Sequence, residues 1–370
     1  MELTLKKFDL LREVSLAQGV VEKKTTIPIL ANLLLDAGSD RLQLSATDLD
    51  VGIRSSCPAK VKKEGAITTP AKSFLDIIRS LPDAEVKIKK LENNWLQINC
   101  ASSSFKVVGL PKDNFPAIPE MKEPVVDLPS GVLLNLINKT IFAIASEESR
   151  YTLNGSLLLV RPLSVTMVAT DGHRLSFIEK QQNFDHLTSE VRVLIPRKAL
   201  AELQRLLAEC GEEDLVSFGK DDTHLFFRIK NRLMFSRMLS GQFPNYEAVL
   251  PKENNRTLVL NREEITAAIR RVALLADDKS RAIKMLLSNN KLEISSSNVE
   301  LGEAKETLET SYGAGPMQIG FNCQYLLDFL GVTEDASVSF EFKDEQSAGQ
   351  LRPATEEEYL YRYIVMPMRV

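Results

Sequence analysis

The residues with the clearest potential for acid–base chemistry are Asp171 and His173, which flank Gly172 in the stretch ATDGHRL. A carboxylate beside an imidazole can orient the ring and stabilise its positive charge, as a general base requires. The sequence supplies no nucleophile for such a pair, because it contains no GxSxG elbow, no P-loop and no HExxH helix. We therefore predict a non-catalytic protein in which His173 is a core or pocket residue.

The cysteines do not indicate metal or redox chemistry. They are scattered along the chain, without a CxxC pair or a histidine at metal-ligand spacing, at Cys57, Cys100, Cys210 and Cys323. This pattern is typical of reduced thiols in a cytosolic protein. The first residues lack the apolar run of a signal peptide, and no stretch approaches the roughly 18–20 apolar residues of a membrane span. The sequence thus predicts a cytoplasmic protein with neither metal nor cofactor.

Positive charge recurs at matching helix positions in a chain whose net charge is -4. Lys72 and Arg79 lie seven residues apart, two turns along one helix face, and Lys198 and Arg205 repeat that spacing. Contacts between such residues and phosphates give sequence-independent, salt-sensitive binding on which a protein can slide. A peptide-binding scaffold without DNA would leave the repeated pairs unexplained. We predict a surface facing nucleic-acid phosphates that comprises Lys72, Arg79, Lys139, Arg197, Lys198, Arg205, Arg270 and Arg271.

The elements that must position these residues form a threefold repeat with a period near 126 residues. One marker is an alternating apolar strand that ends in a small-polar corner, and it reads LQLSATDLD, VTMVATDGH and LEISSSNVE. Asp48, Asp171 and Asn298 occupy the same place in this corner, and only the second stretch contains a histidine. The corner is therefore predicted to be a structural feature of each repeat.

Helices and hairpins recur in the same order. A helix is predicted to start at each of the equivalent residues Pro70, Pro196 and Asn322, and a polar-tipped hairpin follows it. Each repeat also opens with an amphipathic helix, for which Ser130 and Asn261 occupy N-cap positions. Polar, proline-rich connectors near 118–130 and 249–261 are predicted linkers. The chain is therefore predicted to fold as three α+β domains with the bounds 1–125, 126–252 and 253–370.

Several stretches resemble the bacterial DNA sliding clamp, the beta subunit of DNA polymerase III. They are PILANLLL, RYTLNG, ATDGHRL, QFPNYEAVLP and the terminal VMPMRV, and the similarity runs in order from Leu5 to Val370. The resemblance implies three repeated domains of the clamp fold, with helices lining a central hole and antiparallel sheets outside. It implies a closed, head-to-tail homodimeric ring, because a heterologous contact that closes makes a ring. Three repeats distinguish this clamp from the two-domain trimeric clamps of eukaryotes and archaea.

The resemblance also implies a function and its partners. Clamps encircle duplex DNA without sequence specificity, slide on it as processivity factors, and tether the replicative polymerase, the clamp loader and repair proteins. No cofactor is implied. A groove with adaptable methionines suits short apolar peptide motifs. The matching peptide-pocket residues are Leu153, Thr170, Gly172, His173, Arg174, Leu175, Pro244, Val249, Ile364, Val365, Met366, Pro367, Met368 and Arg369.

Six further positions follow from the resemblance. Ala248 stands where some members carry an arginine, which makes the rim of the groove less basic. Lys24 matches a basic loop position that contacts DNA in the family. The ring interface is expected to use one apolar pair from the first repeat and one from the third, namely Phe105 with Val107 and Leu274 with Leu275.

Overall fold

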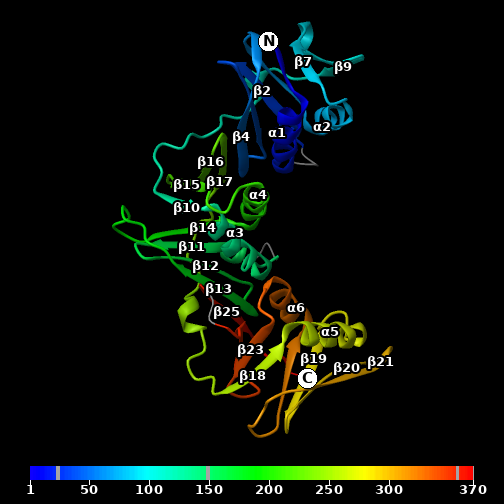
Figure 1. Cartoon of the computed structure of the whole chain (residues 1–370), viewed down its shortest axis with the longest axis vertical. Coiled ribbons are helices and arrows are strands. Elements are labelled where there is room, and N and C mark those ends of the chain that lie inside the picture. The colour runs from blue at the N-terminus through cyan, green and yellow to red at the C-terminus, as the bar shows by residue number, and fades with distance from the viewer. Residues whose placement is uncertain (22–25, 147–150, 356–357, 370) are drawn as a thin grey trace. The chain divides into compact units, whose positions relative to one another are not determined.

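The computed structural model describes residues 1–21, 26–146, 151–355 and 358–369. Each repeat follows one order of elements: a strand, a helix, four strands, a second helix and three strands, with β5 added in the first repeat (Figure 1). The first repeat comprises β1 (Glu2–Lys6), α1 (Lys7–Val20), β2 (Asn32–Gly38), β3 (Arg41–Thr47), β4 (Val51–Pro58), β5 (Lys60–Lys63), β6 (Gly65–Pro70), α2 (Ala71–Ser80), β7 (Glu85–Lys90), β8 (Trp95–Cys100) and β9 (Ser103–Val108).

The second and third repeats match this order without the extra strand. The second comprises β10 (Val126–Pro129), α3 (Ser130–Asn138), β11 (Gly155–Arg161), β12 (Ser164–Thr170), β13 (Arg174–Gln181), β14 (Val191–Pro196), α4 (Arg197–Leu207), β15 (Leu215–Lys220), β16 (His224–Ile229) and β17 (Arg232–Arg237). The third comprises β18 (Arg256–Asn261), α5 (Arg262–Val272), β19 (Ala282–Ser288), β20 (Lys291–Asn298), β21 (Gly302–Glu309), β22 (Met317–Asn322), α6 (Cys323–Val332), β23 (Ser337–Phe342), β24 (Gly349–Pro353) and β25 (Tyr359–Val365).

Strands of neighbouring repeats join into continuous antiparallel sheets. One eight-stranded sheet has the order β10-β15-β16-β17-β4-β3-β2-β6, and the other has the order β14-β11-β12-β13-β25-β24-β23-β18. The five-stranded sheet β5-β1-β7-β8-β9 and the four-stranded sheet β21-β20-β19-β22 remain separate. Each repeat therefore consists of two half-sheets, and the middle repeat gives one half to each eight-stranded sheet.

Because the middle repeat contributes strands to both eight-stranded sheets, the chain divides into two compact units. One unit contains Met1–Leu133 with Lys198–Met238, and the other contains Leu134–Arg197 with Leu239–Val370. The division crosses the middle repeat because its two half-sheets belong to different sheets. The domain bounds drawn from the sequence repeat stay a prediction.

Capping side chains begin two helices where the sequence predicts them. The Asn261 side chain accepts hydrogen bonds from the amides of Glu263 and Glu264 at 3.0 and 3.1 Å. Asn322 accepts from the amide of Gln324 at 2.9 Å. Such bonds satisfy amides that the helix itself leaves unpaired. The prediction for Ser130 is wrong, because its hydroxyl donates instead to the carbonyl of Gly211 at 2.5 Å.

A buried ion pair reinforces the join between the first and second repeats. The Arg232 guanidinium on β17 donates to both carboxylate oxygens of Glu13 on α1, at 2.8 and 3.0 Å. Both residues are buried. Arg232 also lies 3.0 Å from the carboxylate of Glu209. A buried pair of this kind stabilises only if it stays complete, since the loss of one partner leaves an uncompensated charge.

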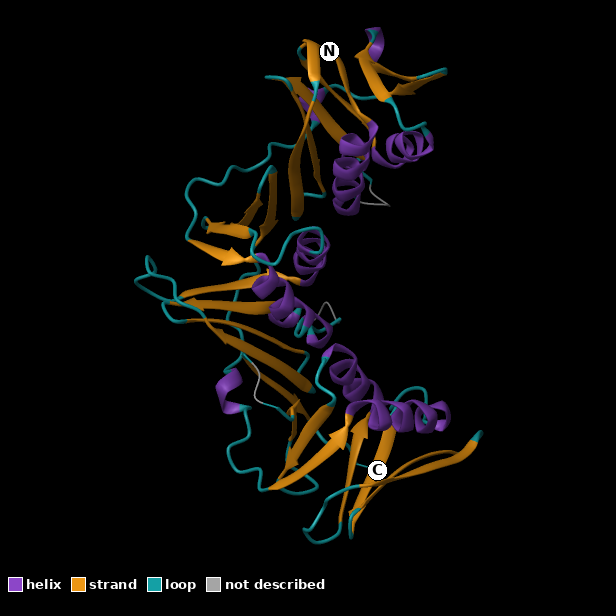
Figure 2. Cartoon of the chain, viewed as in Figure 1, coloured by secondary structure: helices purple, strands orange, loops and turns teal. Residues whose placement is uncertain are grey.

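The helices cover one face of the strands in each unit (Figure 2). In the first repeat, α1 and α2 pack together, and the strands below them bury Leu3, Val86, Ile88, Leu96 and Ile98. The alternate residues on these strands face the opposite side, as the period of two requires. Among the described residues, no helix combines the length and apolarity needed to cross a membrane.

Candidate functional site

The small-polar corner predicted from the repeat has the same hydrogen bonds in all three copies. The Asp171 carboxylate accepts from the amides of His173 and Arg174 at 2.9 and 3.0 Å. In the first repeat, one Asp48 oxygen accepts from the amides at positions 50 and 51 at 2.9 and 2.7 Å. In the third, Asn298 accepts from those at 300 and 301 at 2.9 and 3.2 Å. The side chain thus replaces a backbone acceptor in a tight turn.

The turn also explains the glycine. Gly172 has φ of 88° and the equivalent Leu49 has φ of 81°, in the left-handed region that favours glycine. The hydroxyl of Thr170 accepts from the Gly172 amide at 3.1 Å and donates to the Arg174 carbonyl at 2.6 Å. Asp171 contacts His173 through the histidine's backbone amide, and His173 is exposed. This geometry supports the non-catalytic interpretation of the Asp171–His173 pair.

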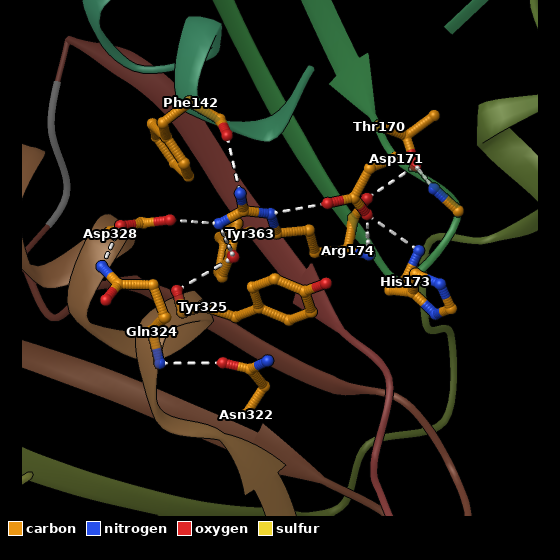
Figure 3. A network of polar contacts seen from close by, with 11 residues as sticks. Phe142, Thr170, Asp171, His173, Arg174, Asn322, Gln324, Tyr325, Asp328 and Tyr363 are labelled. Carbon is orange, nitrogen blue, oxygen red and sulfur yellow. Dashed lines mark hydrogen bonds and ion pairs between the residues drawn. The ribbon is translucent and has the colours of Figure 1, made fainter. Parts of the chain in front are cut away.

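Arg174 connects the corner to the third repeat (Figure 3). Its Nε donates to Asp171 at 3.0 Å, and its Nη1 donates to Asp328 on α6 at 2.5 Å. Nη2 donates to the carbonyl of Phe142 at 2.7 Å. The plane of the guanidinium lies over the ring of Tyr325, 4.3 Å from its centroid. Planar, bidentate and stacked contacts together require arginine, because lysine offers only a point charge.

The surroundings of Arg174 keep its guanidinium protonated although its side chain is only 9% exposed. Burial by itself would lower the pKa of the guanidinium, but Tyr363, Asp328 and Asp171 outweigh burial and raise that pKa above its ordinary value. Burial raises the pKa of the Tyr363 hydroxyl, which therefore remains neutral and donates to the carbonyl of Tyr325 at 3.0 Å.

An apolar groove lies beside this corner, where β13 pairs with β25. The register sets Arg174 opposite Val365 and Leu175 opposite Ile364. The floor is continuous with a core cluster that includes Leu175, Phe243 and Ile364, all at most 2% exposed. Met366 is 39% exposed and forms part of the wall. The cavity measures about 120 Å³ and is lined by Leu153, Thr170, Gly172, His173, Arg174, Leu175, Pro244, Tyr246, Val249, Ile364 and Met366.

Ten of these residues were predicted from the sequence, and Tyr246 was missed. Tyr246 is buried, and its ring stacks on Phe177 at 5.9 Å between centroids. Its place between Pro244 and Val249, two predicted groove residues, was the signal that could have identified it.

The last predicted groove residues lie elsewhere. Val365 is fully buried. Beyond it the chain turns toward β22, where the Met368 amide donates to the Gly320 carbonyl at 2.8 Å. Pro367, Met368 and Arg369 line a second cavity of about 480 Å³. None of these four residues lines the cavity at the corner, so their assignment to the groove stays a prediction.

The predicted basic residues differ in how far their charge is available. Lys72, Arg79, Arg197 and Arg270 are exposed. Three more are also exposed but ion-paired: Lys198 with Asp48, Arg205 with Glu202 at 2.9 Å, and Arg271 with Glu306 at 2.6 Å. Arg197 also lines a polar cavity that contains Asp171 and Asp328. Most of the predicted helix positions are thus at the surface, and three have part of their charge balanced.

Lys139 does not belong to an exposed basic surface. It is only 5% exposed, and its ammonium lies 5.3 and 5.9 Å from the ring centroids of Tyr361 and Tyr359. The cation–π contacts with strand β25 explain why this lysine turns inward. Lys24 lies outside the described residues.

The predicted interface pairs lie beside strands with one free edge. Phe105 and Val107 are half-buried on β9, which pairs only with β8. Leu274 is 77% exposed, and Leu275 is half-buried in the short turn of helix that follows α5 and touches β21. Within the residues that the structure describes, no cluster of three or more His, Cys, Asp or Glu side chains could hold a metal ion.

Comparisons with known proteins agree along the whole chain. Family models of the DNA polymerase III beta subunit match at residues 1–119 (N-terminal domain), 127–245 (central domain) and 247–369 (C-terminal domain). The beta sliding clamps of Pseudomonas aeruginosa and Caulobacter vibrioides are each 35% identical over 372 and 379 residues, covering 100% of both chains.

Solved structures give the same result. The Pseudomonas aeruginosa sliding clamp bound to griselimycin is similar with a TM-score of 0.93 and 34% identity, covering 100% of both chains. The Bacillus subtilis sliding clamp is similar with a TM-score of 0.93 and 28% identity, covering 100% of this chain and 99% of that one. The predicted fold class of three clamp domains is confirmed.

The Arg174 contacts predict a contrast between two neighbouring substitutions. Arg174→Met leaves Asp171 and Asp328 without their shared cation and should destabilise this unit by about 2–4 kcal/mol, less than a fully buried pair because Asp328 is 22% exposed. His173→Ala removes an exposed ring and should stay within about 0.5 kcal/mol of the parent. Scanning calorimetry, with hydrogen exchange of β13 and β25, measures both. Equal destabilisation by the two changes would contradict the role given to Arg174.

Proposed function

Because the chain belongs to the DNA polymerase III beta subunit family, the beta sliding clamps, we propose that it closes as a homodimer around duplex DNA and tethers partners through its groove. Members of this family are non-catalytic processivity subunits, and this chain is one of them. The observation that carries the ring proposal is a pair of unmatched strand edges.

The edges follow from the rule that joins the repeats. The last strand of the second repeat, β17, pairs with β4 of the first, and β25 of the third pairs with β13 of the second. In the first repeat, β9 is equivalent to β17 and β25. In the third, β21 is equivalent to β4 and β13. In the described chain, neither β9 nor β21 pairs with a strand of another repeat. Pairing of β9 with β21 of a second copy would extend the same rule, and unpaired edges of this kind favour such association. A heterologous contact that closes after two copies gives a ring.

Side chains beside the two edges support this contact. Phe105 and Val107 flank one edge, and the exposed Leu274 flanks the other, so apolar surface is available on both sides. Lys106 on β9 and Glu303 and Glu309 on β21 are exposed and opposite in charge. Complementary charge favours the correct encounter of two surfaces.

The groove supports peptide binding by its shape and chemistry. Its floor is a preformed part of the core, so little ordering is needed on binding. Met366 at the wall can adapt to different apolar side chains. The Pseudomonas aeruginosa and Bartonella birtlesii clamps have been solved with griselimycin, and we propose that this chain also accepts that ligand. Polymerase, clamp loader and repair proteins are the proposed natural partners.

Exposed helix cations support sequence-independent DNA contact. Lys72 and Arg79 are exposed on α2, and the structure gives neither an ion pair among its described residues. We propose that they face phosphates, while Lys198 and Arg205 contribute less because acidic neighbours balance them. A cytoplasmic location agrees with these partners. All four cysteines are free, and burial raises the pKa of Cys57 to about 12.

Groove binding predicts different outcomes for two nearby methionines. Met366→Ala should weaken griselimycin binding by about 5- to 30-fold, or 1–2 kcal/mol, because it removes part of the groove wall. Met368→Ala serves as the matched control and should leave affinity unchanged, since Met368 lines the other cavity. Isothermal titration calorimetry measures both. The reverse order of effects would move the binding site to the second cavity.

Ring closure predicts that a charge at the interface yields monomers. The double change Leu274→Ala, Leu275→Lys places an unpaired ammonium against the partner's apolar side chains, which is costly. Light scattering should report the mass of one chain. The control is Leu163→Lys, at a leucine that is 67% exposed between β11 and β12 and lies on neither edge strand, and it should remain dimeric. A dimer mass for the double variant would refute the assigned interface.

If α2 contacts DNA, reversing the charge of its exposed cations should weaken DNA binding. Lys72→Glu with Arg79→Glu changes the net charge from -4 to -8, by two losses of +1 and two gains of -1. Retention on circular DNA should fall, and the salt slope of binding should flatten by about 0.9 per lost phosphate contact. Lys220→Glu with Lys252→Glu makes the same charge change at exposed sites and should retain DNA. Equal loss in both variants would indicate a general charge effect and overturn the helix assignment.

A further inference from the structure

A basic cleft lies on the first repeat, on the sheet face opposite the one that α1 and α2 cover. On β7, Lys89 alternates with the buried Ile88, and on β8, Trp95 alternates with the buried Leu96. The helix cations proposed to contact duplex DNA therefore do not account for Lys89 or Trp95. This face carries positive charge in a chain whose net charge is -4.

The cleft is large and the side chains of its lining have a net positive charge. It measures about 1020 Å³, at the upper end of the roughly 300–1,000 Å³ usual for ligand sites, so an extended ligand fits. Four lysines against two glutamates give the lining a charge of +2. The lining residues are Met1, Lys63, Glu64, Gly65, Ala66, Lys89, Lys90, Leu91, Glu92, Trp95 and Lys106.

The cleft charges are only partly balanced. Glu2 lies 3.2 Å from Lys62 and 3.8 Å from Lys89, so it offsets part of one edge. Lys63 has no ion pair among the residues that the structure describes, whereas Lys106 lies on the edge strand proposed to face the partner subunit. The Lys90 ammonium donates to the Ala66 carbonyl at 3.0 Å, which fixes its position without neutralising it. Unbalanced cations around a cleft attract a polyanion.

Trp95 adds an aromatic surface to this charge. It is 40% exposed and stands opposite Val108 on β9, on the same face as Lys106 and Gln97. We propose that the cleft binds a short segment of single-stranded nucleic acid, with phosphates on the lysines and a base on the Trp95 ring. Cationic grooves with exposed aromatic rings bind single strands in this way, because every base has a face that can stack.

The same observations disfavour other occupants. A duplex hides its base faces, so it could use the lysines but not Trp95. An acidic segment of a second copy would satisfy the lysines but needs no stacking surface. Lys89 lies two strands from the β9 edge and Lys63 lies four, about 10 and 19 Å at the usual strand spacing. This wall of the cleft is therefore separate from the edge proposed to contact the partner subunit, and the proposal goes beyond clamp function.

Trp95 is the single tryptophan of the chain, so its fluorescence reports on the cleft directly. The full-length dimer is titrated with a short oligothymidylate, with a free thymidine nucleotide and with blunt duplex, at low and moderate salt. We expect the single strand to quench Trp95 strongly, the free nucleotide to quench it weakly and the duplex to leave it unchanged. Quenching by the free nucleotide that equals or exceeds that by the strand would overturn the single-strand assignment.

Variants at the cleft test the assignment. Lys63→Glu with Lys89→Glu should weaken binding of the single-stranded oligonucleotide roughly tenfold or more. The salt slope of that binding should flatten by about 1.4, or 0.7 per lost phosphate contact. Lys220→Glu with Lys252→Glu makes the same charge change and should bind as the parent does. Trp95→Ala, followed with a labelled strand by anisotropy, should also bind roughly tenfold more weakly. Circular dichroism confirms folding of each variant.

Three results would refute the proposal. The first is the absence of Trp95 quenching by any single strand at low salt. The second is quenching that survives unchanged in the Lys63→Glu, Lys89→Glu variant. The third is quenching seen only in the monomeric Leu274→Ala, Leu275→Lys variant, because the partner subunit would then fill the cleft in the dimer. Quenching retained in Lys72→Glu, Arg79→Glu would support a site distinct from the helix face.

Discussion

Pairing between strands of different repeats is the constraint on which the rest of the structure depends. Neither β13 nor β25 alone makes a groove, and their register brings Leu175 beside Ile364 and so provides a floor that no single repeat contains. The same rule joins β17 to β4 in the other unit. It leaves β9 and β21 without their usual partner in the described chain, so the geometry that builds the binding site also favours a second copy.

Buried charge reinforces both joins in different ways. In one unit, Arg232 on β17 is held by Glu13 on α1 and Glu209 in the turn after α4. In the other, Arg174 on β13 is held by Asp171 from its own corner and Asp328 from α6. Such pairs add little net stability over apolar packing, but each is costly to leave incomplete. These ion pairs therefore contribute more to fixing how the two repeats fit together than to the free energy of unfolding.

The distribution of charge assigns different roles to residues of the same kind. Lys72 is exposed on a helix and suited to phosphate contact, whereas Lys139, predicted for the same role, lies over tyrosine rings in the interior. Lys89 faces the opposite side of a sheet, beside an exposed tryptophan. A negative net charge is compatible with two basic surfaces, because the potential that a nucleic acid meets is set locally.

The sequence by itself determined the threefold repeat, the α+β class and the corner at Asp171, because local patterning and turn chemistry are written in neighbouring residues. Its short ordered motifs also indicated the family, and that resemblance implied ten residues of the groove cavity. Only the tertiary structure decided that Tyr246 lines the groove cavity, that Met368 lines a different cavity, and that Lys139 is buried. Those outcomes depend on strand register and on contacts between distant segments, such as the Met368–Gly320 bridge and the rings of β25 around Lys139. Spacing along the chain carries no information about the positions of Met368 and Lys139.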